Sequence, residues 1–172
     1  MRILVVSDTH RETSSLVKII RAARGGFDMI LHLGDCAPDS LAAASAAPGS
    51  EVFAVRGNCD GSDPAYRDWL AIPADGHVVF MTHGHRYGVS AGDTTRLYYA
   101  ALERGADVCL FGHTHFPVIE RGGGLLTVNP GSLSRPRGFP APTYAALTIS
   151  GDIVDASIIA VYGDGIYRPA DI

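Results

Sequence analysis

Side chains that could bind a metal ion recur along this chain, each time shortly after an apolar run. Two histidines, His113 and His115, flank one threonine just past the apolar run that ends at Gly112. Four earlier apolar runs are also followed by aspartate, histidine or asparagine, at Asp8, His10, Asp35, Asn58 and His83. Carboxylate, amide oxygen and imidazole are ligands of mid-sized divalent metal ions. One such fragment is typical of a solvent-facing strand end, but five in succession predict a metal site.

The types of these seven side chains indicate how many ions they would hold. Two carboxylates, one amide and four imidazoles are more ligands than one tetrahedral zinc ion uses. They suit two ions about 3.5–4 Å apart that share one carboxylate. The mixed nitrogen and oxygen set favours manganese, iron, cobalt, nickel or zinc over calcium, which prefers oxygen alone. We therefore predict two divalent transition-metal ions per chain, with manganese as the first expectation.

Strands and helices alternate over the first two thirds of the predicted structure. Short apolar runs indicate buried strands near residues 2–6, 28–33, 51–55, 77–82 and 107–111. Helical spacing of apolar residues predicts helices near residues 13–24, 39–47 and 93–105. In the last of these helices Tyr98, Ala101 and Leu102 share the predicted buried face. Farther along, residues 117–129 and 143–161 are predicted to form two hairpins with glycine-containing turns.

This order of elements predicts an α/β fold, which some schemes class as α+β. Strands that alternate with helices are parallel and joined by right-handed crossovers, whereas hairpin strands are antiparallel. Two mixed sheets packed face to face, with helices outside, satisfy both requirements within one domain over residues 1–172. Parallel strands bring their carboxyl-terminal loops to one edge. We expect the seven candidate ligands to meet there.

Composition limits the classes of partner and compartment. The chain has 172 residues, a formal net charge of −4 and three cysteines, Cys36, Cys59 and Cys109. No basic run supports general nucleic-acid binding, and three cysteines make a disulfide framework improbable. No apolar stretch is long enough for a signal peptide or a membrane span. We expect a cytoplasmic protein with a small-molecule partner and no membrane association, for which an oligomer is compatible with the sequence.

Five motifs in chain order, SDTH, LGD, GNCD, THGH and GHTH, resemble those of the calcineurin-like metallophosphoesterases. GNCD and NPGSLSRPR look most like the small bacterial and archaeal phosphodiesterases of this family. The resemblance implies the family's four-layer fold of two sheets flanked by helices. It implies one ion held by Asp8, His10, Asp35 and His115. It implies a second ion held by Asp35, Asn58, His83 and His113, with Asp35 bridging.

His113 and His115 then have separate tasks. On an extended segment, residues i and i+2 point the same way. We therefore expect His113 and His115 to reach the same cluster, with one imidazole for each ion. Gly112 leaves room for the backbone to pass close to the ions.

The resemblance implies a hydrolase that cleaves phosphodiesters. Two adjacent ions make hydroxide available near neutral pH, and this hydroxide, bridging the ions, attacks phosphorus in line. The metals are then the main electrophiles, so no catalytic residue is predicted beyond the ligands. A serine hydrolase is disfavoured because the chain lacks Gly-x-Ser-x-Gly.

Four further residues are candidates for substrate contact or for support of the ligands. Many family members have a histidine directly after the ligand asparagine, where this chain has Cys59. A neutral thiol poorly replaces an imidazolium that faces a dianion, which favours diesters over monoesters. His85 is a candidate to line the pocket or orient His83. Arg135, like Arg137, could clamp a phosphate oxygen, although a solvated turn explains it equally well.

Two other functions compete with this prediction. The same family includes a scaffold subunit of a membrane-trafficking coat, which has the fold without convincing catalysis. Metal content separates that scaffold from an enzyme. A dinucleotide-binding protein is disfavoured because SDTHR, and no Gly-x-Gly-x-x-Gly, follows the first predicted strand.

Overall fold

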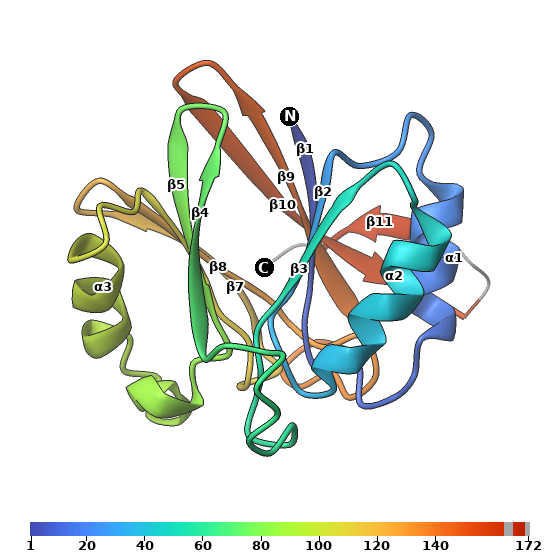
Figure 1. Ribbon diagram of the computed structural model, residues 1–172, viewed down its shortest axis with the longest axis horizontal. Coiled ribbons are helices and arrows are strands. Elements are labelled where there is room, and N and C mark those ends of the chain that lie inside the picture. Colours follow the sequence, from blue (N-terminus) through green and yellow to red (C-terminus); the bar gives the residue numbers. More distant parts are fainter. Residues whose placement is uncertain (164–166, 171–172) are drawn as a thin grey trace.

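Two mixed β-sheets face each other in the computed structural model, which describes residues 1–163 and 167–170 (Figure 1). The six-stranded sheet has the order β11-β10-β9-β1-β2-β3, and the five-stranded sheet has the order β4-β5-β6-β8-β7. The strands of the larger sheet are β1 (Arg2–Val6), β2 (Met29–His32), β3 (Glu51–Ala54), β9 (Thr143–Ser150), β10 (Ile153–Val161) and β11 (Tyr167–Pro169). Those of the smaller sheet are β4 (Trp69–Ala74), β5 (His77–Thr82), β6 (Val108–Leu110), β7 (Pro117–Gly122) and β8 (Leu125–Pro130).

Helices cover the outer face of each sheet, so the predicted sandwich flanked by helices is confirmed (Figure 1). The larger sheet carries α1 (Ser14–Ala22) and α2 (Ser40–Ala46), and the smaller sheet carries α3 (Thr95–Leu102). Short 3-10 turns follow two of the strands, at Ala37–Asp39 after β2 and at His85–Tyr87 and Val89–Ala91 after β5. No helix in the described residues is long and apolar enough to cross a membrane.

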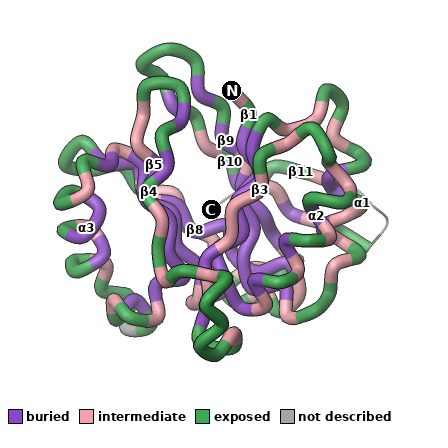
Figure 2. The backbone as a smooth tube through the Cα atoms, in the orientation of Figure 1, coloured by how far each residue is buried: buried purple, intermediate pink, exposed green. Residues whose placement is uncertain are grey.

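The strand β1 shows why the apolar runs of the sequence are continuous. Ile3 and Val5 pack in the core between the sheets, whereas Leu4 and Val6 pack against the helices on the outer face. All four are fully buried, and Figure 2 shows the buried backbone concentrated in the strands. A strand covered on both faces needs apolar residues at every position. Its parallel pairing with β2 and antiparallel pairing with β9 make the sheet mixed.

Two details of the elements differ from the sequence prediction. The strand β4, which pairs antiparallel with β5, was not predicted. It lies at an edge of its sheet, where Pro73 is tolerated because that strand needs fewer hydrogen bonds. The predicted buried face of α3 was right at Ala101, which is fully buried, and at Tyr98, which is partly buried, but wrong at Leu102. Leu97, Ala100 and Ala101 are buried, whereas Leu102 is 40% exposed.

The loops that carry the candidate ligands meet at one end of the sandwich, the lower end in Figure 1. They come from both sheets and not from one sheet edge, because β1, β2 and β3 belong to one sheet and β5 and β6 to the other. Main-chain hydrogen bonds join the loops: the N–H of Asp8 donates to Gly34 O at 3.0 Å, and the N–H of Gly112 donates to His83 O at 3.1 Å. The site therefore spans the two sheets.

Candidate metal centre

Left-handed backbone conformation is concentrated at the candidate ligands. Five of the eight non-glycine residues with positive φ in the described chain are Asp8, His10, Asp35, His113 and His115, with φ between 46° and 67°. Such a conformation is uncommon outside glycine, although aspartate and histidine adopt it more readily than most. It turns the chain sharply, so that short loops aim successive side chains inward. The expectation that residues 113–115 are extended was therefore wrong.

Four of the predicted ligands form one compact group. The ligand atoms of Asp8, His10, Asp35 and His115 all lie within 4.8 Å of one another. His115 Nε2 lies 3.1 Å from Asp8 Oδ1, but without the angle of a hydrogen bond. Asp8 Oδ1 and His10 Nε2 are both buried without a hydrogen-bond partner, which is unfavourable for polar atoms that nothing compensates. A cation between these atoms would satisfy both, so the donor set fits a divalent metal ion.

The remaining predicted ligands lie on the other side of Asp35. His83 Nε2 is 3.2 Å from Asn58 Oδ1 and 3.3 Å from Asp35 Oδ1, and the rings of His83 and His113 have centroids 5.1 Å apart. His10 Nε2, by contrast, faces Asp35 Oδ2 at 4.0 Å. One carboxylate therefore presents a different oxygen to each group of nitrogen ligands.

Hydrogen bonds on the far side of three imidazoles determine which nitrogen faces the centre. His83 Nδ1 donates to Leu33 O at 2.8 Å, and His115 Nδ1 donates to Arg135 O at 2.6 Å. Each ring then directs Nε2 inward with its lone pair available. His113 is reversed: its Nε2 bonds Ser90 Oγ at 2.9 Å, which leaves Nδ1 for a metal. Partners of this kind orient metal-ligating histidines and select their tautomer.

The protonation equilibria of His10, His113 and Asp8 also favour the forms that bind a metal. Burial lowers the pKa of His10 and of His113 below the usual histidine value, and a metal binds the neutral imidazole. Burial alone would raise the pKa of Asp8, but the neighbouring His115 and His83 lower it overall. The Asp8 carboxylate in turn raises the pKa of His115.

Gly112 allows the close backbone approach that the sequence predicted. A Cβ atom at this position would overlap Ser7 Oγ and lie 3.0 Å from Asp8 Oδ2. The neighbouring N–H of His113 donates to that same Asp8 oxygen at 3.1 Å. Any side chain at residue 112 would therefore separate the loop after β6 from the loop after β1.

Asp60 joins two ligand loops, a role that the sequence did not predict. Its Oδ1 accepts hydrogen bonds from the N–H groups of Cys36 and Ala37, each at 2.9 Å. Its Oδ2 accepts one from Gly57 at 2.7 Å. Asp60 thus ties the loop of Asp35 to the loop of Asn58. The sequence signal was limited to its place two residues after the candidate ligand.

His32 has a similar role behind the group of Asp8, His10, Asp35 and His115. Its Nδ1 accepts the N–H of Gly34 at 3.2 Å, so its Nε2 donates to Thr9 Oγ1 at 2.9 Å. Thr9 then donates to Asp39 Oδ2 at 2.6 Å. Burial lowers the pKa of His32 to about 4, which keeps the ring neutral. These hydrogen bonds connect Thr9, which lies between Asp8 and His10, with Gly34, which precedes Asp35.

Cys59 and His85 lie near the predicted centre in different ways. Cys59 donates from Sγ to Asp35 Oδ2 at 3.1 Å and from its main-chain N–H to Asp35 Oδ1 at 3.0 Å. Burial, and then the hydrogen bond to Asp35, raise the pKa of the Cys59 thiol to about 11. The His85 ring stands 5.4 Å from the His83 ring, centroid to centroid. Its Nδ1 is buried without a partner, so His85 does not orient His83 by a hydrogen bond from that atom.

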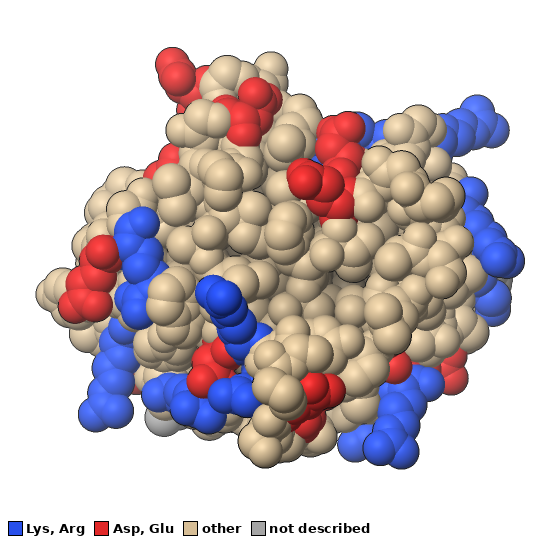
Figure 3. Space-filling model, viewed as in Figure 1, with Lys and Arg blue, Asp and Glu red and all other residues tan. Residues whose placement is uncertain are grey.

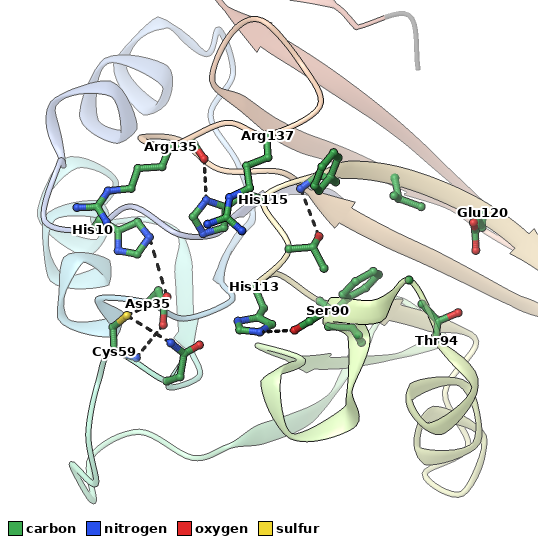
Figure 4. A pocket seen from close by; sticks show the side chains of 17 residues that line it. His10, Asp35, Cys59, Ser90, Thr94, His113, His115, Glu120, Arg135 and Arg137 are labelled. Carbon is green, nitrogen blue, oxygen red and sulfur yellow. Dashed lines mark hydrogen bonds and ion pairs between the residues drawn. The ribbon is translucent and has the colours of Figure 1, made fainter.

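A pocket of about 520 Å³ opens from this centre. Figure 4 shows His10, Asp35 and Cys59 at one end and Thr94 and Glu120 at the other. Arg135 and Arg137 lie along the same wall as His10 and His115. The volume falls in the range of roughly 300–1,000 Å³ that is usual for small-molecule sites. Over the face of the molecule seen in Figure 3, Lys and Arg side chains are interspersed with Asp and Glu.

Residues 1–152 match the sequence profile of the calcineurin-like phosphoesterase superfamily domain, and the chain belongs to this family. It is 35% identical over 153 residues to "Probable metallophosphoesterase YsnB" of Bacillus subtilis, covering 88% of this chain and 86% of that protein. It is 30% identical over 187 residues to "Phosphodiesterase YfcE" of Escherichia coli, covering 93% of this chain and 96% of that protein. The chain is thus a metallophosphoesterase-family protein, as its motifs predicted.

Solved structures share the whole architecture. The crystal structure of a conserved uncharacterized protein from Streptococcus pneumoniae, a predicted phosphoesterase, has a TM-score of 0.79 at 29% identity. The match covers 98% of this chain and 96% of the Streptococcus pneumoniae protein. Wild-type Vps29 of Entamoeba histolytica, solved with Zn²⁺, has a TM-score of 0.80 at 22% identity over 99% of this chain and 97% of its own. The latter likeness concerns the fold alone.

Proposed function

We propose that this chain is a phosphodiesterase that works with two divalent transition-metal ions, manganese being the first expectation. Asp8, His10, Asp35 and His115 would hold one ion, and Asp35, Asn58, His83 and His113 the other. The observation that carries this proposal is the placement of Asp35, whose Oδ2 faces His10 while its Oδ1 faces His83. A bridging carboxylate needs that arrangement.

The residues of the chain divide the work of hydrolysis. When bound, two adjacent divalent ions lower the pKa of the water they share and stabilise charge on the phosphoryl oxygens. Asp35 sets the spacing of the two sites, and the neutral imidazoles complete them. Arg135, whose guanidinium lies beside His10 (Figure 4), binds a phosphoryl oxygen of the substrate. A guanidinium suits this task because it donates paired hydrogen bonds to phosphate.

The preference for diesters rests on Cys59 and on the relatives. Cys59 carries no positive charge beside the centre, so the chain offers less neutralisation to a monoester dianion than a histidine there would. A diester carries one negative charge fewer than a monoester dianion, so it loses less electrostatic stabilisation when no histidine stands at this position. The name of the related Escherichia coli protein, phosphodiesterase, agrees with this preference.

A scaffold on the same fold is the competing function. The likeness to Vps29 stands at 22% identity and therefore supports the fold without supporting a scaffold role. Seven filled ligand positions favour an enzyme, because a scaffold has no use for buried, unpaired polar atoms such as Asp8 Oδ1.

Metal dependence tests the proposal directly. After dialysis against a chelator, the protein should lose hydrolysis of an aryl phosphodiester, and added Mn²⁺, Co²⁺ or Ni²⁺ should restore it. The matched aryl monoester should be the poorer substrate under the same conditions. Full turnover in excess chelator would refute the metal mechanism. A protein that neither takes up metal nor hydrolyses either ester would favour the scaffold.

A further inference from the structure

Phe116 is an aromatic residue in a place that packing alone does not explain. It follows the candidate ligand His115 directly in the chain and lines the same pocket as His10, His113 and His115. Its side chain is 48% exposed. An exposed phenylalanine is common on a protein surface, but here it borders a centre whose other wall residues are mostly polar. The proposed metal chemistry gives this ring no task.

The position of the Phe116 ring is set by a glycine. Gly138 has φ +68°, and a Cβ atom there would overlap Cδ1 and Cε1 of Phe116. The ring therefore packs directly on the main chain of Gly138, which any larger residue would prevent. The N–H of Phe116 also donates to Thr114 Oγ1 at 3.3 Å. A ring held from behind in this way is a rigid apolar surface at the side of the pocket.

The groups around the ring suit a planar, polar-edged partner. Arg135 and Arg137 line the same pocket, and the N–H of Arg137 is anchored on His115 O at 3.1 Å. Guanidinium groups stack on aromatic faces as well as binding phosphate. Ser90 and Thr94 stand across the pocket (Figure 4), where their hydroxyls can bond the edge of a heterocycle. A purely aliphatic arm would use neither the guanidinium groups nor the hydroxyls.

We propose that Phe116 determines specificity by stacking on an aromatic arm of the phosphodiester, of which a nucleobase is the chemical type that fits best. The proposal rests on the proposed phosphodiesterase function and adds the class of substrate. The phosphoryl group lies at the metal end of the pocket, and the base lies on Phe116. Stacking of a base on an aromatic side chain contributes about tenfold in affinity, in the lower part of the known range.

The test compares two diesters in manganese-loaded proteins by ³¹P NMR of the products. Thymidylyl-(3′→5′)-thymidine carries bases, whereas the glycerol arms of glycerophosphoglycerol carry hydroxyl groups but no aromatic ring. Wild-type protein should prefer the former, measured as the ratio of the two kcat/KM values. Phe116→Leu, which stays apolar but lacks the ring, should lower this ratio about tenfold. Phe116→Tyr should retain it, and so should Tyr99→Leu, a control at a 60% exposed aromatic outside the pocket.

Other outcomes would overturn the inference and are separable from failure of the phosphodiesterase proposal. An unchanged ratio in Phe116→Leu, at full metal content, would show that the ring does not select the substrate. A wild-type preference for glycerophosphoglycerol would keep the phosphodiesterase and refute the aromatic arm. If manganese-loaded wild-type protein hydrolysed no phosphodiester at all, the proposed function itself would fall.

Discussion

Cys59 is the residue at which this chain departs from the motif it resembles. Its Sγ contacts Asp35, yet the side chain offers no base and no charge to a phosphoryl group. A cysteine nucleophile requires a lowered pKa, whereas burial and the hydrogen bond to Asp35 raise this one to about 11. We therefore expect Cys59 to tune the charge of the site without reacting.

Two substitutions at this position separate charge from reactivity. Cys59→Ser should keep substantial diester hydrolysis. Cys59→His should raise monoester relative to diester hydrolysis, because an imidazolium can bond the dianion and protonate the leaving group. Well-placed general acids contribute about 10²–10⁴-fold, and we expect less from this loop. The measurement is kcat/KM for matched aryl esters. A Cys59→Ser protein that holds its metal but is inactive would make the thiol catalytic.

Among the elements, the loops after β2 and β3 depend on Asp60 for their relative position. Its carboxylate accepts three main-chain N–H groups from the two loops. Asp60→Asn keeps the size of the side chain but places an amide N–H against at least one of those donors. Loss of such a supporting group typically costs about 10–100-fold in metal affinity. The effect should appear in affinity because Asp60 itself is no ligand.

Competition with a chromogenic chelator measures that affinity. We expect Mn²⁺ to bind Asp60→Asn about tenfold or more weakly than wild type. Asp63→Asn is the control, since Asp63 accepts the N–H of Ala65 within one exposed turn. Equal affinities in the Asp60 and Asp63 variants would contradict the proposal that Asp60 supports the metal site by holding the two loops together.

A second contact between elements joins the two sheets away from the site. His77, at the start of β5, bonds Asp107 through Nδ1 and the carbonyl of Gly151, in the β9–β10 turn, through Nε2. The hydrogen bond to Asp107 is the main cause that raises the pKa of His77, with Gly151 and the charge of Asp152 adding to it. Both ring nitrogens face acceptors, so the doubly protonated ring makes both bonds. A surface pocket beside this contact is lined by His77, Asp107 and Arg121.

The sign of the resulting pH dependence is fixed by the raised pKa. The stabilisation of the folded state by protonated His77 is fully present below the pKa of about 6.5 that a histidine has in the unfolded chain. It is lost as the pH rises through the higher pKa of His77 in the folded state. In chelator, which removes metal effects, His77→Gln should lower Tm more at pH 5.5 than at pH 9. Thermal unfolding of both proteins at the two pH values checks this. A larger Tm difference at pH 9 would contradict it.

At the scale of the whole molecule, the site exists because two sheets end their strands at the same place. Asp8, Asp35 and Asn58 come from the larger sheet, and His83 and His113 come from the smaller. In the sequence, the aspartate, asparagine and histidine residues lie shortly after the apolar runs that form the strands. The group of candidate ligands could therefore be predicted without a structure. Apolar runs such as residues 3–6 were equally clear, because their strands are buried on both faces.

The features that escaped prediction depend on tertiary context. β4 has few buried residues and a proline, so its signal as a strand is weak, and its pairing with β5 makes it one. The turn at His113 and His115 is set by contacts to Asp8 and Arg135 that no local pattern encodes. Phe116 belongs to none of the five motifs, so nothing in the sequence indicated a role for it. Its place beside the pocket follows from Gly138, more than twenty residues later in the chain.

The number of metal ions per chain, with and without Asp35, tests the account most directly. Elemental analysis of manganese-loaded protein should give about two ions for wild type. Asp35→Ala should lose metal from both sites, because each ion would lose the shared carboxylate, whereas His115→Ala should mainly lose one. Folding should survive both changes, since the ligands lie on loops outside the core. Two ions per chain in Asp35→Ala would contradict the bridged pair on which the proposed phosphodiesterase rests.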